Sequence, residues 1–226
     1  MKGSFQRFLF QFSYPQFQFS NAISKEVNIN DKELNNIIDA PCGNGETSYL
    51  IAKNCNKQVE GFDLDSDSIM NAKTNFGRPN LSYGQADIHA LVLKKEKFEV
   101  FCMINSLFLL PRVDDLLEVI RKKLVDSGSF YVVIPNTKGN NFIRFSSSNP
   151  NINSLLINES EIELYFNDRG FKIKAVKPLC YSSWLNRKFK FRMGPIQGVY
   201  LMIESHFRRI LKIGPANYFL IVLKKR

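Results

Sequence analysis

A short polar turn follows the first apolar segment of the chain and holds the residues best spaced for chemistry. The apolar segment ends at Asp39, the turn contains Gly43-x-Gly45, and a helical pattern opens at Glu46. Two closely spaced glycines let a backbone turn sharply and approach a ligand. Asp63 ends a second apolar segment eighteen residues after Gly45. This spacing is close to the offset of about twenty residues at which an acidic side chain hydrogen-bonds a ribose hydroxyl. The spacing predicts a site for a ribose-containing ligand.

The acid that precedes the glycines separates two classes of cofactor. Nicotinamide and flavin dinucleotides place a pyrophosphate at the helix N-terminus, beside a third glycine that permits close packing. Here Ser48 stands at that third position, and Asp39 would lie beside the anion. S-adenosylmethionine instead carries a sulfonium and an ammonium, which a nearby carboxylate attracts. The charges favour S-adenosylmethionine as cofactor; a glycine turn that binds nothing is the remaining alternative.

Only two histidines, His89 and His206, are present as candidate general bases. Methyl transfer from a sulfonium is an in-line displacement with an activated leaving group, so positioning and desolvation carry most of the catalysis. A base is needed only where the acceptor must lose a proton. His89 and His206 are therefore weak catalytic candidates, and the alternative for each is an ordinary structural or surface residue.

The elements that must position these residues follow an alternating pattern. Short apolar runs rich in β-branched and aromatic residues alternate with amphipathic stretches, which predicts an α/β fold with a doubly wound, mostly parallel sheet. The expected strands are Asn36 to Asp39, Gln58 to Phe62, Leu81 to Gln85, Phe98 to Ile104, Ser129 to Ile134, Phe171 to Lys177 and Tyr218 to Leu223. The expected helices are Glu46 to Lys53, Ser66 to Asn75, Val113 to Val125 and Glu159 to Arg169, the last two stopping near Gly128 and Gly170.

Two segments do not fit this repeat, although the length predicts one domain over residues 1–226. Residues 1–33 are rich in phenylalanine, and residues 178–216 form an insertion between the last two expected strands. Segments of this length are usually functional or carry secondary structure of their own. We expect the first to act as a lid or cap and the second to cover the acceptor site.

The net charge and the cysteine content limit the classes of protein to which the chain can belong. The net charge is +10, and from Phe171 to Arg226 thirteen Lys or Arg side chains face one acid, Glu204. Solvation, a phosphate-bearing partner or an anionic membrane surface would each explain this imbalance. The four cysteines have neither disulfide-type nor metal-type spacing, and no continuous signal or membrane-spanning segment is present. We expect a soluble cytoplasmic protein with no metal site.

Five segments, in order, resemble the class I methyltransferase family, which uses S-adenosylmethionine, from about Asn36 to Leu223. They are Ile37-Ile38-Asp39-Ala40-Pro41-Cys42-Gly43-Asn44-Gly45, Gly61-Phe62-Asp63-Leu64-Asp65, Gly84-Gln85-Ala86-Asp87-Ile88, Phe98 to Leu110, and Leu124-Val125-Asp126-Ser127-Gly128-Ser129. The resemblance implies a seven-stranded sheet whose last strand is antiparallel. Two positions depart from the family: Pro41 replaces the first glycine of the usual Gly-x-Gly-x-Gly, and Glu99 stands where Asp is frequent.

The resemblance also implies roles at matching positions. Gly43 and Gly45 would lie beside the methionine moiety, with Asp39 organising the turn. Asp63 would bind the ribose. The full set of implied or expected cofactor contacts is Asp39, Gly43, Gly45, Asp63, Leu64, Asp87, Ile88 and Asn105, with Asp87 and Ile88 at the adenine and Asn105 at the end of the fourth strand. The alternatives are a helix cap for Asp63, a loop carboxylate for Asp87 and a loop hydrogen bond for Asn105.

The acceptor is the least determined feature. Asn105-Ser106-Leu107-Phe108 lacks the Asn/Asp-Pro-Pro-Tyr/Phe motif with which relatives hold an adenine or glutamine amide. Aromatic residues in the insertion, with Tyr181, Trp184 and Tyr200 as the named candidates, favour a small apolar or aromatic metabolite. An RNA acceptor held by the basic C-terminal face is the second hypothesis, and a binding module without activity is the third. The stretch from Val199 to Lys212 can form a helix suited to a lid or a membrane contact, and no obligate protein partner is implied.

Overall fold

The computed structural model describes residues 14–137, 159–181, 207, 210–211 and 216–226. Its strands are β1 (Asn36–Asp39), β2 (Gln58–Asp63), β3 (Leu81–Gln85), β4 (Phe98–Ile104), β5 (Leu124–Pro135), β6 (Phe171–Tyr181) and β7 (Ala216–Lys225). Its helices are α2 (Tyr14–Asn30), α3 (Glu46–Cys55), α4 (Ser66–Asn75), α5 (Ile88–Lys94), α6 (Val113–Lys123) and α8 (Glu159–Asp168), with a 3-10 turn η1 (Leu107–Leu109). All seven expected strands are present.

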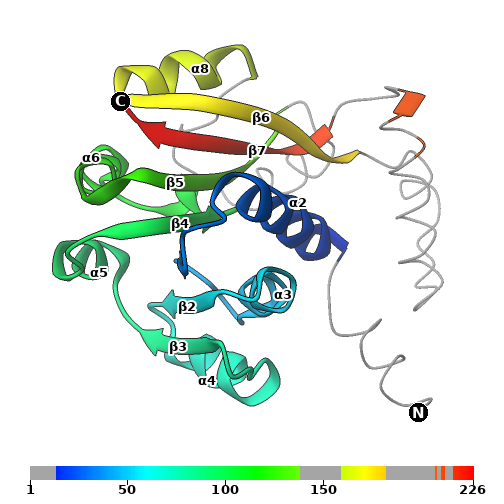
Figure 1. Ribbon diagram of the computed structural model, residues 1–226, viewed down its shortest axis with the longest axis vertical. Coiled ribbons are helices and arrows are strands. Elements are labelled where there is room, and N and C mark those ends of the chain that lie inside the picture. Colours follow the sequence, from blue (N-terminus) through cyan, green and yellow to red (C-terminus); the bar gives the residue numbers. More distant parts are fainter. Residues whose placement is uncertain (1–13, 138–158, 182–206, 208–209, 212–215) are drawn as a thin grey trace.

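The strands form one sheet in the order β3-β2-β1-β4-β5-β7-β6 (Figure 1). Neighbours from β3 to β5 pair in parallel, and β7 pairs antiparallel with both β5 and β6. The expected doubly wound sheet with an antiparallel last strand is confirmed. The strand order reverses between β1 and β4, and open α/β sheets bind ligands outside the carboxyl ends of the strands at such a switch point.

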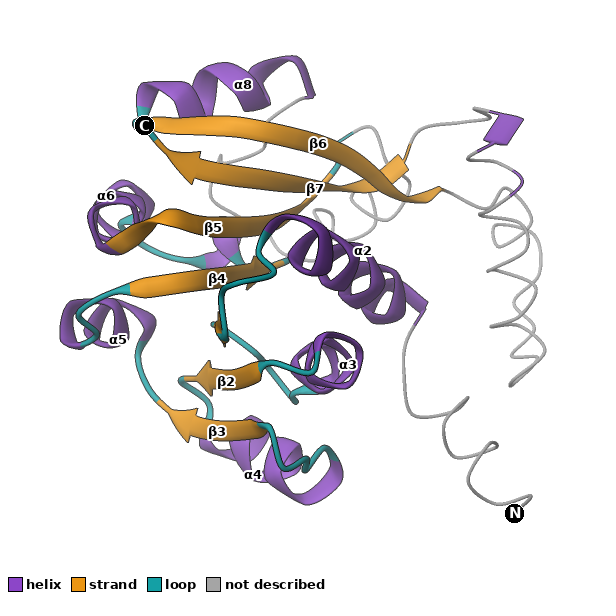
Figure 2. Ribbon diagram, in the orientation of Figure 1, coloured by secondary structure: helices purple, strands orange, loops and turns teal. Residues whose placement is uncertain are grey.

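Helices cover both faces of the sheet (Figure 2), and β4 shows why. Val100 and Cys102 point into a core shared with α2 and α3, whereas Phe101 and Met103 point into a core shared with α5, α6 and α8. Alternate side chains of a strand face opposite sides, so a strand buried on both faces reads as a continuous apolar run. This arrangement leaves the strand ends, rather than the faces, open to ligands.

The structure differs from the sequence expectations in four elements. Residues 14–30 form a helix, α2, inside the segment expected as an irregular cap, and α5 was not anticipated. Helix α6 ends at Lys123, so Gly128 is not its stop; the β4–β5 register instead shifts beside Gly128, where a Cβ would meet the Glu99 carbonyl oxygen at 2.8 Å. Pro178 to Tyr181 belong to β6 rather than to the insertion. Gly170 does end α8, with φ at 73°.

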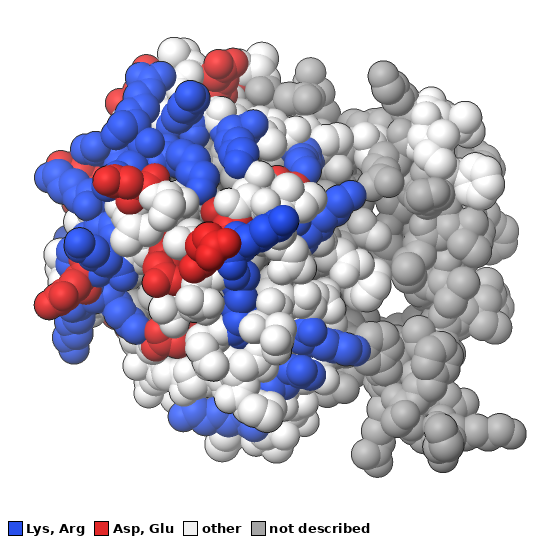
Figure 3. All heavy atoms as spheres, in the orientation of Figure 1, with Lys and Arg blue, Asp and Glu red and all other residues white. Residues whose placement is uncertain are grey.

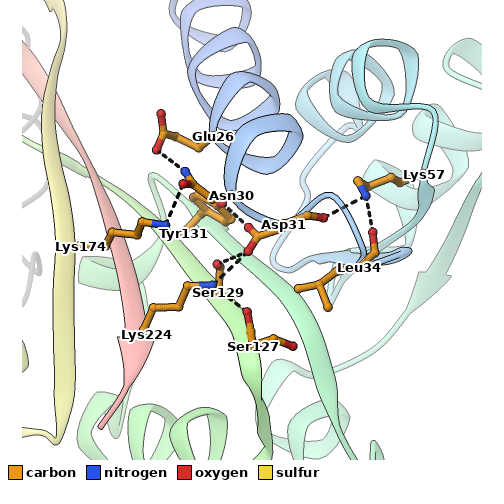
Figure 4. A network of polar contacts seen from close by, with 10 residues as sticks. All are labelled: Glu26, Asn30, Asp31, Leu34, Lys57, Ser127, Ser129, Tyr131, Lys174 and Lys224. Carbon is orange, nitrogen blue, oxygen red and sulfur yellow. Dashed lines mark hydrogen bonds and ion pairs between the residues drawn. The ribbon is translucent and has the colours of Figure 1, made fainter.

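Helix α2 crosses the near face of the sheet in Figure 1 and is anchored by polar contacts at its C-terminal end (Figure 4). Its apolar stripe of Phe19, Ile23 and Val27 is buried, as the spacing of four residues requires. Just beyond the helix, the carboxylate of Asp31 accepts hydrogen bonds from Ser129 Oγ at 2.7 Å, Lys224 Nζ at 3.0 Å and the Tyr131 hydroxyl. Lys57 Nζ donates to the main-chain oxygens of the residues that follow the helix. These contacts join α2 to β5 and β7.

Candidate active site

A cleft of about 370 Å³ opens at the carboxyl ends of β1, β2 and β4. Its position is the switch point of the sheet, where β1 and β4 pair. Residues of three kinds line it: acids, neutral polar side chains and apolar side chains. They are Gln16, Phe19, Asp39, Pro41, Cys42, Gly43, Asn44, Glu46, Thr47, Asp63, Ile104, Asn105, Ser106 and Leu109. Two separate parts of the chain, α2 and the strand ends, therefore meet in one site.

Asp63 at the end of β2 fixes the glycine turn. Its Oδ2 accepts the backbone N–H of Gly43 at 2.7 Å, and its Oδ1 accepts the N–H of Asp65 at 3.0 Å. Asp65, rather than Asp63, caps α4, accepting from the N–H groups of Asp67 and Ser68. The capping alternative for Asp63 is therefore wrong. Asp63 lines the cleft as a carboxylate that also organises the turn.

The two glycines are needed for different reasons. Gly43 has φ at 53°, and a Cβ built there meets nothing within 4 Å, so its half-buried backbone borders open space in the cleft. Gly45 has φ at 82°, and a Cβ there would lie 2.7 Å from the Tyr83 hydroxyl oxygen. That hydroxyl donates to the Gly45 main-chain oxygen at 3.0 Å. Gly43 leaves room for a ligand, and Gly45 lets α3 start tightly against β3.

Pro41 is tolerated because its neighbours supply the hydrogen bonds of the turn. The N–H of Ala40 donates to Cys102 O at 3.1 Å, and the N–H of Cys42 donates to Phe62 O at 2.8 Å. The Cys42 thiol faces the cleft, but burial and the charges of Asp39 and Asp63 raise its pKa. It therefore remains a neutral thiol near pH 7 and is not an activated nucleophile.

Asp39 lies at the bottom of the cleft and is only 1% exposed. Its Oδ2 accepts from Ser48 Oγ at 2.5 Å, whereas its Oδ1 has no partner among the described residues. Burial raises the pKa of Asp39 to about 7; the Ser48 hydrogen bond lowers the pKa, and the charge of Asp63 raises it again. A buried carboxylate with one unused oxygen is stabilised by a cationic ligand.

On the opposite side of β1, the end of β4 presents Asn105 and Ser106. Asn105 has φ at 54°, and its N–H donates to Val133 O at 2.8 Å. Asn105 Oδ1 and Ser106 Oγ are buried without a partner among the described residues. Gln16 reaches the same cleft from α2, and its buried Oε1 is likewise unpartnered within the described part of the chain. On the β4–α2 side of the cleft, three neutral polar groups therefore have no hydrogen-bond partner among the described residues.

The structure brings together half of the expected cofactor contacts. Asp39, Gly43, Asp63 and Asn105 line the cleft, whereas the other four are not among its lining residues. Gly45 caps α3, and Leu64, 64% exposed, follows β2 directly. Asp87 caps α5 by accepting the Ala90 N–H at 3.0 Å, and Ile88 is buried in the core. The roles of all eight in cofactor binding remain predictions.

Of the expected catalytic and acceptor residues, the two that the structure describes, His89 and Tyr181, do not line the cleft. His89, on α5, has a buried and unpartnered Nε2 but is not among the lining residues of the cleft. Tyr181 is the last residue of β6 and is also outside the lining. His206, Trp184 and Tyr200 lie outside the described residues, as does most of the predicted helix from Val199 to Lys212. No helix in the described part of the chain is both long and apolar enough to cross a membrane.

Several lining residues were not anticipated. Asn44 belongs to the turn already singled out, and Glu46 and Thr47 begin α3 directly after it. Ser106 follows Asn105 directly, so proximity to the motifs was an available signal. Gln16 and Phe19 carried no such signal, because only the folded position of α2 brings them to the cleft. Among the described lining residues none is Lys, Arg or His. This chemistry suits a ligand that donates hydrogen bonds and carries positive charge, and it disfavours a pyrophosphate.

Comparisons with known proteins agree with the geometry. The family model described as "Methyltransferase domain" matches residues 31–184. No curated protein sequence matches the chain. Among solved structures, a SAM-dependent methyltransferase from Archaeoglobus fulgidus has a TM-score of 0.64 at 15% identity, covering 98% of each chain.

Two further structures share the fold at low identity. A complex from Haloferax volcanii between the Trm112 methyltransferase activator and a methyltransferase gives a TM-score of 0.63 at 13% identity, covering 91% of this chain and 93% of that one. The plantazolicin methyltransferase BpumL in complex with SAH gives a TM-score of 0.60 at 18% identity, covering 94% of this chain and 85% of that one. With the fold, the cleft and the family model in agreement, the chain belongs to the class I family of S-adenosylmethionine-dependent methyltransferases.

Proposed function

We propose that the cleft binds S-adenosylmethionine and that the protein transfers its methyl group to a small apolar or aromatic metabolite. The observation that carries this proposal is the polarity of the cleft. Its unpartnered buried atoms are all oxygens: Gln16 Oε1, Asp39 Oδ1, Asn105 Oδ1 and Ser106 Oγ. The cationic ammonium and sulfonium of the cofactor match the Asp39 carboxylate, and N–H or O–H groups of the acceptor match the neutral oxygens on the β4–α2 side.

The cofactor fits the β1–β2 side of the cleft. Asp63, at the end of β2, is the acid placed to accept the ribose hydroxyls. Asp39 presents its unused oxygen and its charge to the cationic methionine end, and Gly43 leaves space for close approach. Leu64, Asp87 and Ile88, at the ends of β2 and β3, are proposed to flank the adenine. When bound, the cofactor supplies a methyl group already activated on a sulfonium.

The acceptor then fits the β4–α2 side. Phe19, Ile104 and Leu109 supply apolar lining there, which suits an apolar or aromatic body. The protein's contribution to the displacement is to align the acceptor atom with the methyl group and to exclude water. A general base is not required for an acceptor that is already a neutral nucleophile. Tyr181, Trp184 and Tyr200 are proposed as further acceptor contacts from the insertion.

The placement of described basic residues favours a metabolite over RNA. In the C-terminal half, Lys172 is the second residue of β6, and Lys224 and Lys225 end β7, so these residues lie at the amino ends of the parallel strands. Figure 3, in the same orientation, shows Lys and Arg side chains gathered at the side where β6 begins in Figure 1. The cleft is at the opposite ends of the strands. A phosphate backbone held by this basic surface would lie far from the methyl donor.

Labelling separates the two acceptor classes. The full chain is incubated with methyl-labelled S-adenosylmethionine and a cell extract, and the lipid, small-metabolite and RNA fractions are counted. We expect label in the small-metabolite or lipid fraction. Label confined to RNA would overturn the acceptor assignment, and failure to bind S-adenosylmethionine in calorimetry would overturn the proposed activity itself.

A further inference from the structure

Unpartnered buried polar atoms are concentrated at the cleft. Among the described residues, eight buried side-chain nitrogen or oxygen atoms have no hydrogen-bond partner, and four of these eight belong to residues that line the cleft. Buried polar groups in folded proteins are nearly always paired, so a local excess needs an explanation. Asp39 is explained by the cofactor. Gln16, Asn105 and Ser106 are not.

The topology separates these three residues from the cofactor side. Strand β1 pairs on one side with β2, which carries Asp63, and on the other with β4, which leads into Asn105 and Ser106. Gln16 enters from α2, which packs on α3 and also reaches β6 and β7. The cleft thus has a charged side on β1 and β2 and a neutral polar side on β4 and α2. The neutral side is where a methyl acceptor must lie if the charged side holds the cofactor.

Helix α2 is fixed well enough to position a recognition residue. Figure 4 shows Asp31, directly after the helix, facing Ser129, Tyr131 and Lys224 on the sheet. On the helix itself, Glu26 forms an ion pair with Lys177 of β6. Phe19, one turn from Gln16, packs edge-on against Tyr218 of β7, with ring centroids 4.9 Å apart. Side chains on rigidly held elements recognise ligands with less ordering cost.

We infer that Gln16, together with Asn105 and Ser106, determines acceptor specificity by accepting hydrogen bonds from a neutral or cationic amine or hydroxyl group of the acceptor. The inference rests on the proposed function, because it places the acceptor beside a bound cofactor. The two amide oxygens can only accept, and the Ser106 hydroxyl can accept as well, so an N–H or O–H group satisfies all three. The acids Asp39, Asp63 and Glu46 would repel a carboxylate or phosphate, and the two amides could pair with such an anion only by turning their NH2 groups toward it.

Three probes of similar size and different charge test this inference. Benzylamine, benzyl alcohol and benzoate are titrated into the full chain saturated with S-adenosylhomocysteine, and their affinities are measured by saturation-transfer NMR. We expect the amine and the alcohol to bind at least about fivefold more tightly than benzoate. Gln16→Met, which keeps the length but removes the amide, should weaken binding of the alcohol at least about fivefold, as expected for loss of a buried hydrogen bond.

The control is Gln18→Met, since Gln18 lies on the same helix but outside the cleft lining. It should leave all three probe affinities unchanged, and both variants should bind S-adenosylhomocysteine within about twofold of the parent chain. Benzoate binding as tightly as the alcohol, unchanged affinities in Gln16→Met, or no binding of any probe would overturn the inference. Absence of S-adenosylhomocysteine binding would instead overturn the proposed function.

Discussion

The two sides of the cleft are built differently. On the β1–β2 side the polar groups are largely engaged: Asp63 holds the Gly43 N–H, Ser48 donates to Asp39, and Tyr83 holds the Gly45 main-chain oxygen. On the β4–α2 side, Gln16, Asn105 and Ser106 present oxygens with no partner among the described residues. One side is preorganised by the protein itself. The other is completed only by what binds there, and this difference matches a fixed cofactor and a variable acceptor.

The largest effect should come from breaking the anchor of α2 with Asp31→Ala. Asp31 is 2% exposed and pairs with Lys224. Removing its carboxylate leaves the buried hydroxyls of Ser129 and Tyr131 and the partly buried Lys224 ammonium without their acceptor, so we expect a loss of about 3–5 kcal/mol in the free energy of unfolding, measured by urea denaturation.

The exposed ion pair of Lys225 and Asp126 is the control, because Lys225→Ala should cost at most about 1 kcal/mol. In the fraction of Asp31→Ala that remains folded, cofactor affinity should be near that of the parent chain. If Asp31→Ala lost more affinity for the cofactor than for benzyl alcohol, the β1–β2 and β4–α2 sides of the cleft would not be independent.

The second effect concerns the cofactor side. Asp63→Ala should weaken S-adenosylmethionine binding by about 1–3 kcal/mol, the range for a lost hydrogen bond to a charged group, as measured by calorimetry. Asp65→Ala is the matched control: it removes the cap of α4 and should reduce stability by about 1 kcal/mol while leaving affinity unchanged. A folded Asp63→Ala variant with normal affinity would remove Asp63 from the binding site.

The third effect is a pH dependence that originates in Asp39. Its folded pKa of about 7 lies above the ordinary 3.8, so the folded, cofactor-free protein keeps a proton that the unfolded chain loses between these values. Stability from this group is therefore present at low pH and declines as pH rises toward 7. A cationic cofactor requires the carboxylate form of Asp39. The dissociation constant of the cofactor should therefore be about tenfold larger at pH 6 than at pH 8.

Asp39→Asn separates this group from other titrating residues. Without the charge, the variant should bind the cofactor more weakly at pH 8 and should show a flatter dependence of affinity on pH. Its cofactor-free melting temperature at pH 8 should be higher than that of the parent chain, because a buried charge has been removed. An equally steep dependence in the variant would assign the titration to another group.

The smallest effect tests how far the cofactor side extends. Asp87 is both the cap of α5 and an expected adenine contact. Asp87→Ser keeps a capping oxygen, so the melting temperature should change little. If the carboxylate also contacts the cofactor, affinity should fall by roughly two- to fivefold, the scale of one exposed hydrogen bond. Unchanged affinity would leave Asp87 with a capping role alone.

Much of the sheet and the cofactor side could be predicted from the sequence because both depend on local patterns. Strands β1, β3 and β4 agree with expectation residue for residue. Of these, β4 is buried on both faces and appears as a continuous apolar run, whereas β3 lies at the edge of the sheet and has no fully buried residue. The glycine turn and Asp63 lie within 25 residues of one another, counted from Asp39 to Asp63 inclusive. Helix α5 carried a readable signal that was missed: Asp87 precedes buried Ile88, Leu91 and Val92 at helical spacing.

The acceptor side could not be predicted in the same way. Gln16 and Asn105 are distant in sequence, and only the packing of α2 across the sheet brings both to one cleft. The aromatic spacing before residue 14 hid the period of four in Phe19, Ile23 and Val27. Tertiary position, rather than local pattern, makes Gln16 a candidate recognition residue.

The anchor of α2 also bears on the order in which the protein is made. Asp31 and Lys224 are 193 residues apart, and β7 is synthesised after the six other strands that the structure describes. Strands β1 to β5 can pair before then, but α2, which carries Gln16, and Asp31 directly after it gain their contacts with Tyr218 and Lys224 only when β7 is synthesised. A nascent chain would therefore acquire its cofactor side first and its acceptor side last, so that the choice of acceptor waits for completion of the fold.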